Sequence, residues 1–135
     1  MKAIQDLNFP EGLTYSDEHV WVKSQGNIYR IGISDYAQDQ LGDVIFVELP
    51  EAGSRFSAGD IFGTVESVKT VSDLFMPVDG EVTAVNPLLV NHPEAVNTDP
   101  YGKGWMLEIR PDDPLSAQTL GTSTAYVARL GKESP

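Results

Sequence analysis

Apolar and polar residues alternate along residues 19–34, HVWVKSQGNIYRIGIS, in the pattern of a β-hairpin. Val20 and Val22 alternate with Trp21 and Lys23, the turn letters Ser-Gln-Gly-Asn follow, and a second alternating run comes after the turn. In a strand, successive side chains point to opposite faces, so alternation is the signature of half-buried strands. The pattern therefore predicts two antiparallel strands joined by a short turn.

The next segment, SDYAQDQLG at residues 34–42, has the start and stop signals of a short helix. Ser34 suits the N-cap, Asp35 suits the positive end of the helix dipole, and Gly42 falls where a left-handed residue would end the helix. Residues 43–50, DVIFVELP, then predict a strand of buried character that ends at Pro50.

Strands are also predicted on both sides of residues 66–73, ESVKTVSD, and in WMLEIR near the end of the chain. Residues 86–104 hold three prolines and two glycines and predict a long irregular connection. A C-terminal helix is expected to start near Thr122 to Thr124 and to stop at Gly131. We expect a mostly β fold with small flanking helices, in a single domain of residues 1–135 with a helical tail at about 115–131.

A faint internal repeat relates two of the predicted strands. GDVIFV starts at Gly42 and GEVTAV at Gly80, 38 residues later, and each leads through a loop to a strand that ends in Glu. Two such units would put Lys69 near a pseudo-twofold axis at one extremity of the domain; chance similarity between short strands is the alternative explanation.

Composition narrows the classes of function. The 135-residue chain has no cysteine, which excludes disulfides, thiolate nucleophiles and cysteine-ligated zinc. Its formal net charge of −11 repels nucleic acid and anionic membranes and favours partners with basic docking patches. No apolar run approaches the length of a membrane span, and the first residues resemble neither a signal peptide nor a transit peptide. We therefore expect a cytoplasmic protein with neither nucleic acid nor membrane as partner.

The sequence offers no catalytic or metal-binding constellation. His19 and His92 are the only histidines and do not have a metal-ligand spacing; we expect His19 to be structural, beside Trp21, and His92 to be a loop residue. There is no Gly-x-Ser-x-Gly motif, and YGKGW at residues 101–105 lacks the other parts of a phosphate-binding loop. The chain is expected to be neither an enzyme nor a metal protein.

Lys69 is the residue whose setting points to chemistry. It lies at the predicted tip between two strands, among Val68, Thr70 and Val71, where Asn-Gly, Asp-Gly or Pro would be usual. A lysine in a turn is ordinarily only solvated. Here small or β-branched neighbours leave the amine accessible, and the flanking strands supply the stiffness that a presented side chain needs.

The segment ESVKTVSDLFMPVDGEVTAVNP, which contains Lys69, resembles the lipoyl-attachment region of the glycine cleavage system H protein family. The likeness continues through IGISDYAQDQLGDVIFVELPEAG, VNTDPYGKGWMLEI and YSDEHVWV, and covers about Leu13 to Arg110 with a weaker helical tail. The E-S-V-K-x-x-S-D pattern is specific, because biotin carriers place the lysine between methionines and the lipoyl domains of 2-oxo acid dehydrogenases usually have Asp-Lys-Ala.

The resemblance implies a lipoyl group in amide linkage to Lys69, on a hairpin tip of a barrel-sandwich hybrid built from two small sheets. It also implies Glu66, three residues before the lysine, as a recognition residue for the modifying enzymes. Acylation removes the ammonium charge and lengthens the side chain into a flexible arm. The disulfide in the five-membered ring at its end is strained and opens easily.

The resemblance further implies a monomeric carrier with no catalytic residues of its own. In the family, a pyridoxal-phosphate-dependent glycine decarboxylase loads an aminomethyl group and a tetrahydrofolate-dependent aminomethyltransferase takes the carbon. Dihydrolipoyl dehydrogenase, which uses FAD, then reoxidises the dithiol with NAD as acceptor. Lipoate ligase or octanoyltransferase attaches the group.

Family members hold the loaded arm in a cleft with acidic groups, and Asp73 matches one acidic position. The chain departs from the family at Val20, because it reads His-Val-Trp where members commonly read His-Glu-Trp. Glu18 lies two residues earlier, so in a strand it would point to the same side and could replace the missing carboxylate; the alternative is a solvated surface residue. His19 is a further candidate for the cleft.

Two other functions fit the same residues. A lipoyl-relay protein of the same fold would need the same lysine and would serve the lipoylation of other enzymes. An unmodified interaction module would keep the fold without the arm. The expectation from the sequence is the glycine cleavage carrier.

Overall fold

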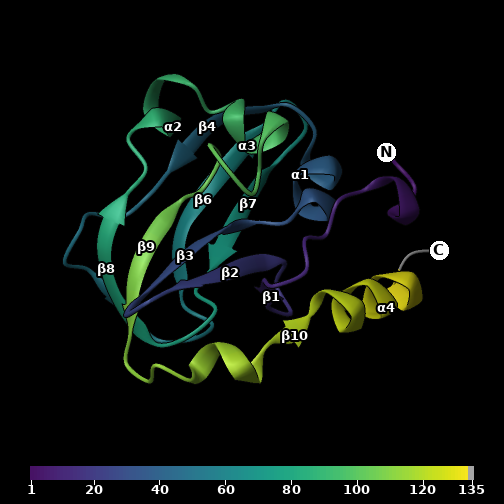
Figure 1. Ribbon diagram of the computed structural model, residues 1–135. Coiled ribbons are helices and arrows are strands. Elements are labelled where there is room, and N and C mark those ends of the chain that lie inside the picture. Colours follow the sequence, from purple (N-terminus) through teal and green to yellow (C-terminus); the bar gives the residue numbers. More distant parts are fainter. Residues whose placement is uncertain (134–135) are drawn as a thin grey trace.

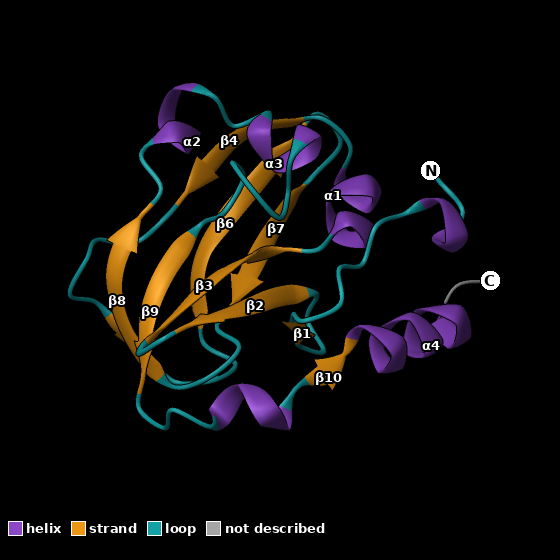
Figure 2. Cartoon of the chain, in the orientation of Figure 1, coloured by secondary structure: helices purple, strands orange, loops and turns teal. Residues whose placement is uncertain are grey.

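Residues 1–133 are described by the computed structural model, and they form two antiparallel sheets with short helices at their edges (Figures 1 and 2). The larger sheet has the order β10-β1-β2-β3-β9-β8-β5, and the smaller has the order β4-β6-β7. The strands are β1 (Thr14–Tyr15), β2 (Val20–Gln25), β3 (Ile28–Ile33), β4 (Val44–Glu48), β5 (Arg55–Phe56), β6 (Ile61–Ser67), β7 (Val71–Phe75), β8 (Gly80–Val85), β9 (Leu107–Pro111) and β10 (Gly121–Thr122). The helices are α1 (Asp35–Leu41), α2 (Leu88–Asn91), α3 (Ala95–Thr98) and α4 (Ser123–Glu133), with 3₁₀ turns at Ile4–Asp6 and Ser116–Thr119. The two sheets are not joined into a closed barrel, and the predicted mostly β architecture is confirmed.

The main apolar core lies between the two sheets. Ile31 and Leu107 of the larger sheet and Val65 and Leu74 of the smaller sheet are buried in one contiguous cluster. Burial of such side chains contributes roughly 1.5–3 kcal/mol each, so the two sheets hold each other in place.

The hairpin predicted for residues 19–34 is confirmed as β2 and β3, which pair from Val20↔Ile33 to Gln25↔Ile28. The alternation of buried and exposed side chains predicted for β2 is wrong, because Val20, Trp21 and Val22 are all buried. Trp21 belongs to a second apolar cluster on the other face of β2, formed with Tyr15, Tyr126 and Leu130. Helix α4 and the N-terminal segment, which run beside β1 and β10 in Figure 1, cover this face.

The signals for α1 are confirmed at both ends. The Ser34 hydroxyl accepts a hydrogen bond from the Ala37 N–H at 3.2 Å, and Gly42 has a φ of 77°. Helix α4 begins at Ser123 as predicted, but the predicted stop at Gly131 is wrong because the helix continues to Glu133. One glycine costs a helix only about 1 kcal/mol. Burial of Leu130 in the second cluster offsets this cost and stabilises the last turn of α4.

Strand β4 is less buried than its apolar sequence predicts. Val44 and Val47 lie in the core, whereas Ile45 and Phe46 are 51% and 53% exposed. The register between β4 and β6 shifts between Val44 and Phe46, and such a bulge turns an extra side chain outwards. The buried character predicted for residues 43–50 is therefore wrong at two of its apolar positions, Ile45 and Phe46.

The internal repeat has a structural counterpart. Strand β8 shows the same irregularity between Val82 and Ala84 in its pairing with β9, at the positions 38 residues after those in β4. The two units GDVIFV and GEVTAV thus form bulged strands in different sheets.

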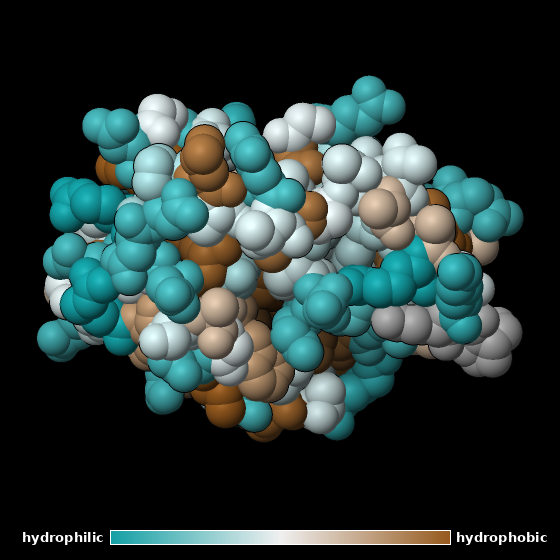
Figure 3. All heavy atoms as spheres, turned by 90° about the horizontal axis from the view of Figure 1, so that it is seen from below, coloured by the Kyte–Doolittle hydropathy of each residue, from teal (hydrophilic) through white to brown (hydrophobic). Residues whose placement is uncertain are grey.

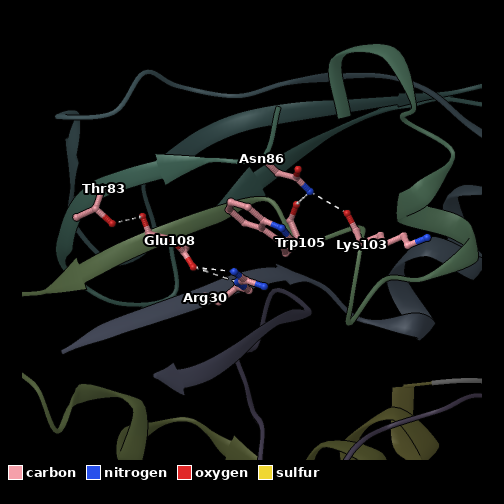
Figure 4. A network of polar contacts seen from close by, with 6 residues as sticks. All are labelled: Arg30, Thr83, Asn86, Lys103, Trp105 and Glu108. Atoms are coloured by element: carbon pink, nitrogen blue, oxygen red, sulfur yellow. Dashed lines mark hydrogen bonds and ion pairs between the residues drawn. The ribbon is translucent and has the colours of Figure 1, made fainter. Parts of the chain in front are cut away.

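Residues 86–104 are more ordered than predicted, because they contain the single-turn helices α2 and α3. Asn86 ties this segment to the sheet (Figure 4). Its buried amide nitrogen donates to the carbonyls of Lys103 and Trp105 at 2.8 and 2.7 Å, and its amide oxygen accepts from the Leu88 N–H at 3.0 Å. These bonds satisfy backbone groups that an irregular connection would leave to water.

The surface seen from below is largely hydrophilic, and apolar atoms form separate patches between polar side chains (Figure 3). Among residues 1–133, none of the helices has the length and apolar character that crossing a membrane would require.

Candidate functional site

Lys69 lies exposed at the tip of the hairpin formed by β6 and β7. The turn is closed by Ser67, which is buried and was not among the residues proposed from the sequence. Its hydroxyl oxygen accepts from the N–H groups of Lys69 and Thr70, each at 3.2 Å, and its own N–H donates to the Thr70 carbonyl at 2.8 Å. A serine that bonds the backbone two and three residues ahead stabilises a turn without Asn-Gly or Pro.

The tip rests on the connection between α1 and β4. The Val68 N–H donates to the Asp43 carbonyl at 3.0 Å. The aliphatic part of Lys69 lies over Gly42, so close that a Cβ on Gly42 would come within 2.8 Å of Lys69 Cε. Gly42 therefore has two roles: its positive φ ends α1, and its lack of a side chain leaves room for the aliphatic part of Lys69.

Asn97 on α3 holds the connection between α1 and β4 in place through two hydrogen bonds. Its amide nitrogen donates to the Gly42 carbonyl at 2.9 Å, and its amide oxygen accepts from the Val44 N–H at 2.8 Å. Neither Ser67 nor Asn97 is a candidate in the sequence. A serine two residues before the lysine is a detectable turn signal, whereas the partners of Asn97 lie more than 50 residues away and leave no local trace.

A cleft of about 310 Å³ lies beside the hairpin, lined by the start of β2, by α1 and by β7. Of the residues proposed from the sequence, the structure brings Glu18, His19 and Asp73 to this cleft, together with Val20. Glu66 lies elsewhere, exposed and directly opposite Val71 across the β6–β7 ladder. His92 is also apart from the cleft, beside Glu94 at 3.2 Å.

Glu18 lines the cleft, but its backbone conformation differs from the predicted strand. It lies in a turn and not in a strand, because β2 begins only at Val20 and His19 has a left-handed φ of 68°. The argument from strand alternation is therefore wrong for Glu18. Val20 is 1% exposed, so its side chain belongs to the wall of the cleft and to the core together.

His19 links the cleft to the C-terminal helix. Its Nδ1 is 2.7 Å from the hydroxyl of Tyr126, which also lies 2.8 Å from the hydroxyl of Ser34, the N-cap of α1. Burial raises the pKa of Tyr126 well above its ordinary value, so the phenol keeps its proton near neutral pH. The prediction of a structural role for His19 fits these contacts, and its ring also lies beside that of Tyr36, with the centroids 5.2 Å apart.

Within residues 1–133, no group of three or more His, Asp or Glu side chains is placed to hold a metal ion. The site is thus an exposed lysine on a stiff tip with an acidic cleft beside it.

Residues 13–133 match the sequence profile of the family described as Glycine cleavage H-protein. The chain belongs to this family. It is 48% identical over 122 residues to the glycine cleavage system H protein of Bacteroides thetaiotaomicron, a match that covers 90% of this chain and 97% of the relative. It is 50% identical over 124 residues to that of Magnetococcus marinus, covering 92% of this chain and 89% of the relative.

The fold agrees with the family. The crystal structure of a glycine cleavage system H protein from Mycobacterium marinum matches with a TM-score of 0.80 at 37% identity, and the match covers 90% of this chain and 98% of that one. The H protein is the lipoyl carrier of the glycine cleavage system, so the carrier function and the barrel-sandwich fold expected from the sequence are confirmed.

Proposed function

We propose that Lys69 is the lipoyl attachment site and that the lipoyl group is bound there as an amide. The supporting observation is the tip itself: Lys69 is exposed, its backbone is fixed by Ser67, and its stem lies on Gly42. When bound, the lipoyl group supplies a reactive disulfide that carries the aminomethyl group and accepts electrons. The chain's own residues hold the attachment point rigid and leave the amine free for an enzyme to reach.

The proposal extends to the partners of the protein and to its location in the cell. The partners are the pyridoxal-phosphate-dependent glycine decarboxylase, the tetrahydrofolate-dependent aminomethyltransferase, the FAD-containing dihydrolipoyl dehydrogenase, and a lipoate ligase or octanoyltransferase. The net charge of −11 supports brief, salt-sensitive docking to basic patches. We place the protein in the cytoplasm, as a monomeric single-domain carrier without catalytic residues of its own.

Intact mass tests the attachment. Protein made in a host supplied with lipoate should carry one lipoyl increment, and peptide mapping should place it on Lys69. Protein that lacks the increment, or carries it on another lysine, would contradict the proposal.

We propose that Glu66 is read by the enzyme that modifies Lys69. Only about a thousandth of an ordinary lysine is neutral near pH 7.4, so that enzyme must grip the hairpin while the proton leaves. Glu66 is exposed on the strand that leads to the tip. Glu66→Ala should lower kcat/KM for lipoylation about fivefold, the expected loss for one exposed charged contact between the two proteins, with little change in melting temperature. Equal rates would remove Glu66 from this role.

We propose that Asp73 and Glu18, with His19, hold the positively charged cargo in the cleft. All three line it, and a carboxylate beside an amine favours the charged form. Both carboxylates are exposed, so their attraction is screened by salt. Asp73→Asn should raise the loss of ammonia from loaded protein, without the transferase, by about fivefold at low salt and less at high salt. A salt-independent change, or none, would show that Asp73 does not protect the cargo.

A further inference from the structure

Four large apolar side chains are exposed around the hairpin that presents Lys69. Ile45, Phe46, Val68 and Val71 have relative exposures of 51%, 53%, 65% and 61%. We call these four residues the hairpin patch. Single exposed apolar residues are common on protein surfaces, but a contiguous group of them marks an interaction site.

The strand register brings the patch together. Phe46 lies opposite Glu66 in the β4–β6 ladder, and Glu66 lies opposite Val71 in the β6–β7 ladder. Residues directly opposite one another project from the same face of a sheet, so Phe46 and Val71 flank the Glu66 carboxylate. Ile45 joins them because of the bulge in β4, and Val68 joins them at the tip.

These four side chains lie outside the core between the two sheets, although Phe46 also borders a groove in front of α2 with Leu89 and Val90. The inward face of the same three strands is filled by Val47, Val65, Phe62 and Leu74, all buried. A β4 strand that served only the core could have polar residues at positions 45 and 46, and the bulge would then expose nothing apolar. The exposure of the patch is therefore a feature that folding alone leaves unexplained.

The charges around the patch restrict the partner. Strands β4, β6 and β7 carry three carboxylates, Glu48, Glu66 and Asp73, and no Lys or Arg, while Lys69 between β6 and β7 adds one positive charge until it is acylated. The Coulomb field of this face favours a partner whose apolar contact surface is bordered by basic side chains.

The length of the Lys69 side chain before and after acylation restricts the partner further. Before acylation the Lys69 amine is at the end of an ordinary lysine side chain, so an enzyme that acts on it must cover the surface next to the tip. After acylation the reacting atoms are at the end of a much longer arm, and an enzyme that acts on them can stay away from the tip. The acylating enzyme is thus the partner that must touch the hairpin patch.

We propose that Ile45, Phe46, Val68 and Val71 form the docking surface for the acyltransferase that modifies Lys69, with Glu66 as the charged contact at its centre. This inference rests on the proposed attachment at Lys69. In the reaction the deprotonated Lys69 Nζ attacks the carbonyl carbon of an acyl-adenylate. The amide C–N bond forms, the C–O bond to the phosphate breaks, AMP leaves with that electron pair, the attacking nitrogen releases one proton to solvent, and no oxidation or reduction occurs.

The test uses the whole chain with a purified lipoate ligase, lipoate and ATP, and follows acylation by intact mass. The variant is Phe46→Thr with Val71→Thr, which keeps strand propensity and removes apolar surface. We expect KM for the protein to rise about tenfold with kcat within about twofold, as for the loss of docking contacts. The matched control is Ile61→Thr, since Ile61 is 50% exposed on β6 at the end remote from the tip, and its KM should stay within about twofold.

A second measurement separates docking from chemistry. Lys69→Arg protein cannot be acylated and should compete with wild-type substrate, and adding the two threonine substitutions should weaken this inhibition by the same factor as KM. An unchanged KM for the double variant overturns the inference, as does an equal rise for Ile61→Thr. The inference is also overturned if the double variant, once lipoylated, binds the glycine decarboxylase more weakly while its unmodified form binds the ligase as the wild type does. If wild-type protein gains no mass at Lys69, the proposed attachment itself fails.

Discussion

Lys69→Arg is expected to abolish lipoylation and, with it, the support of glycine decarboxylation. The guanidinium keeps the charge and the reach of the side chain but is not an acceptor for the acyl group. The fold should persist, because exposed substitutions of this kind change stability by no more than about 0.5 kcal/mol. The measurements are intact mass, bicarbonate exchange into glycine with purified decarboxylase, and a thermal melt.

Lys103→Arg is the control for that experiment. Lys103 is also exposed, in the loop before β9, and has no part in the proposed attachment. It should be lipoylated at Lys69 and support exchange as the wild type does. Exchange by lipoylated Lys69→Arg protein would show that another lysine carries the group.

Gly63→Ala is expected to destabilise the protein by about 3 kcal/mol, at the upper end for overpacking. A Cβ on Gly63 would overlap the carbonyl oxygen of Glu48 on the neighbouring strand. Backbone atoms cannot swing aside as a side chain can, so β4 would have to move away from β6. The loss should appear as a lower midpoint of urea unfolding with an unchanged slope.

Gly131→Ala is the matched control for the glycine effect. Gly131 lies within α4, its φ is not left-handed, and a Cβ there would have nothing within 4 Å. Alanine at this position should stabilise the protein by up to about 1 kcal/mol through helix propensity. If both substitutions lowered stability by the same amount, the overlap with Glu48 would not be the cause.

Much of the fold could be predicted wherever a short pattern decides the outcome. The turn signals between β2 and β3, and the cap residues Ser34 and Gly42 at the two ends of α1, are local and predicted these elements correctly, although the alternation within β2 did not hold. The misses have tertiary causes. Ile45 and Phe46 are exposed by a bulge whose pairing partner lies in another segment, and α4 passes Gly131 because Leu130 is buried against distant residues.

The helices α2 and α3 were missed for a related reason. Each has only four residues, too few to show a period of 3.6, and each has a proline within two residues of it. Their backbone groups are satisfied by Asn86 and by turns within the segment, which a sequence pattern does not reveal.

The candidate site was predicted unevenly. Local pattern singled out Lys69 as an accessible amine on a stiff tip, and the family resemblance supplied the lipoyl group as its expected modification. Glu18 reaches the cleft although the strand argument for it was wrong. Asn97 could not have been found, because its contacts with Gly42 and Val44 exist only in the folded chain.

The support beneath Lys69 limits how far its hairpin could be moved to another protein. Ser67 travels with the eight residues ESVKTVSD, so a grafted loop or a synthetic peptide would keep the bonds that close the turn. The Asp43 carbonyl and Gly42 would stay behind, and the lysine would lose the surface on which its stem lies. If the proposed attachment at Lys69 holds, a portable acceptor tag built from this protein should include the 42–44 segment and the strand pair as well as the tip.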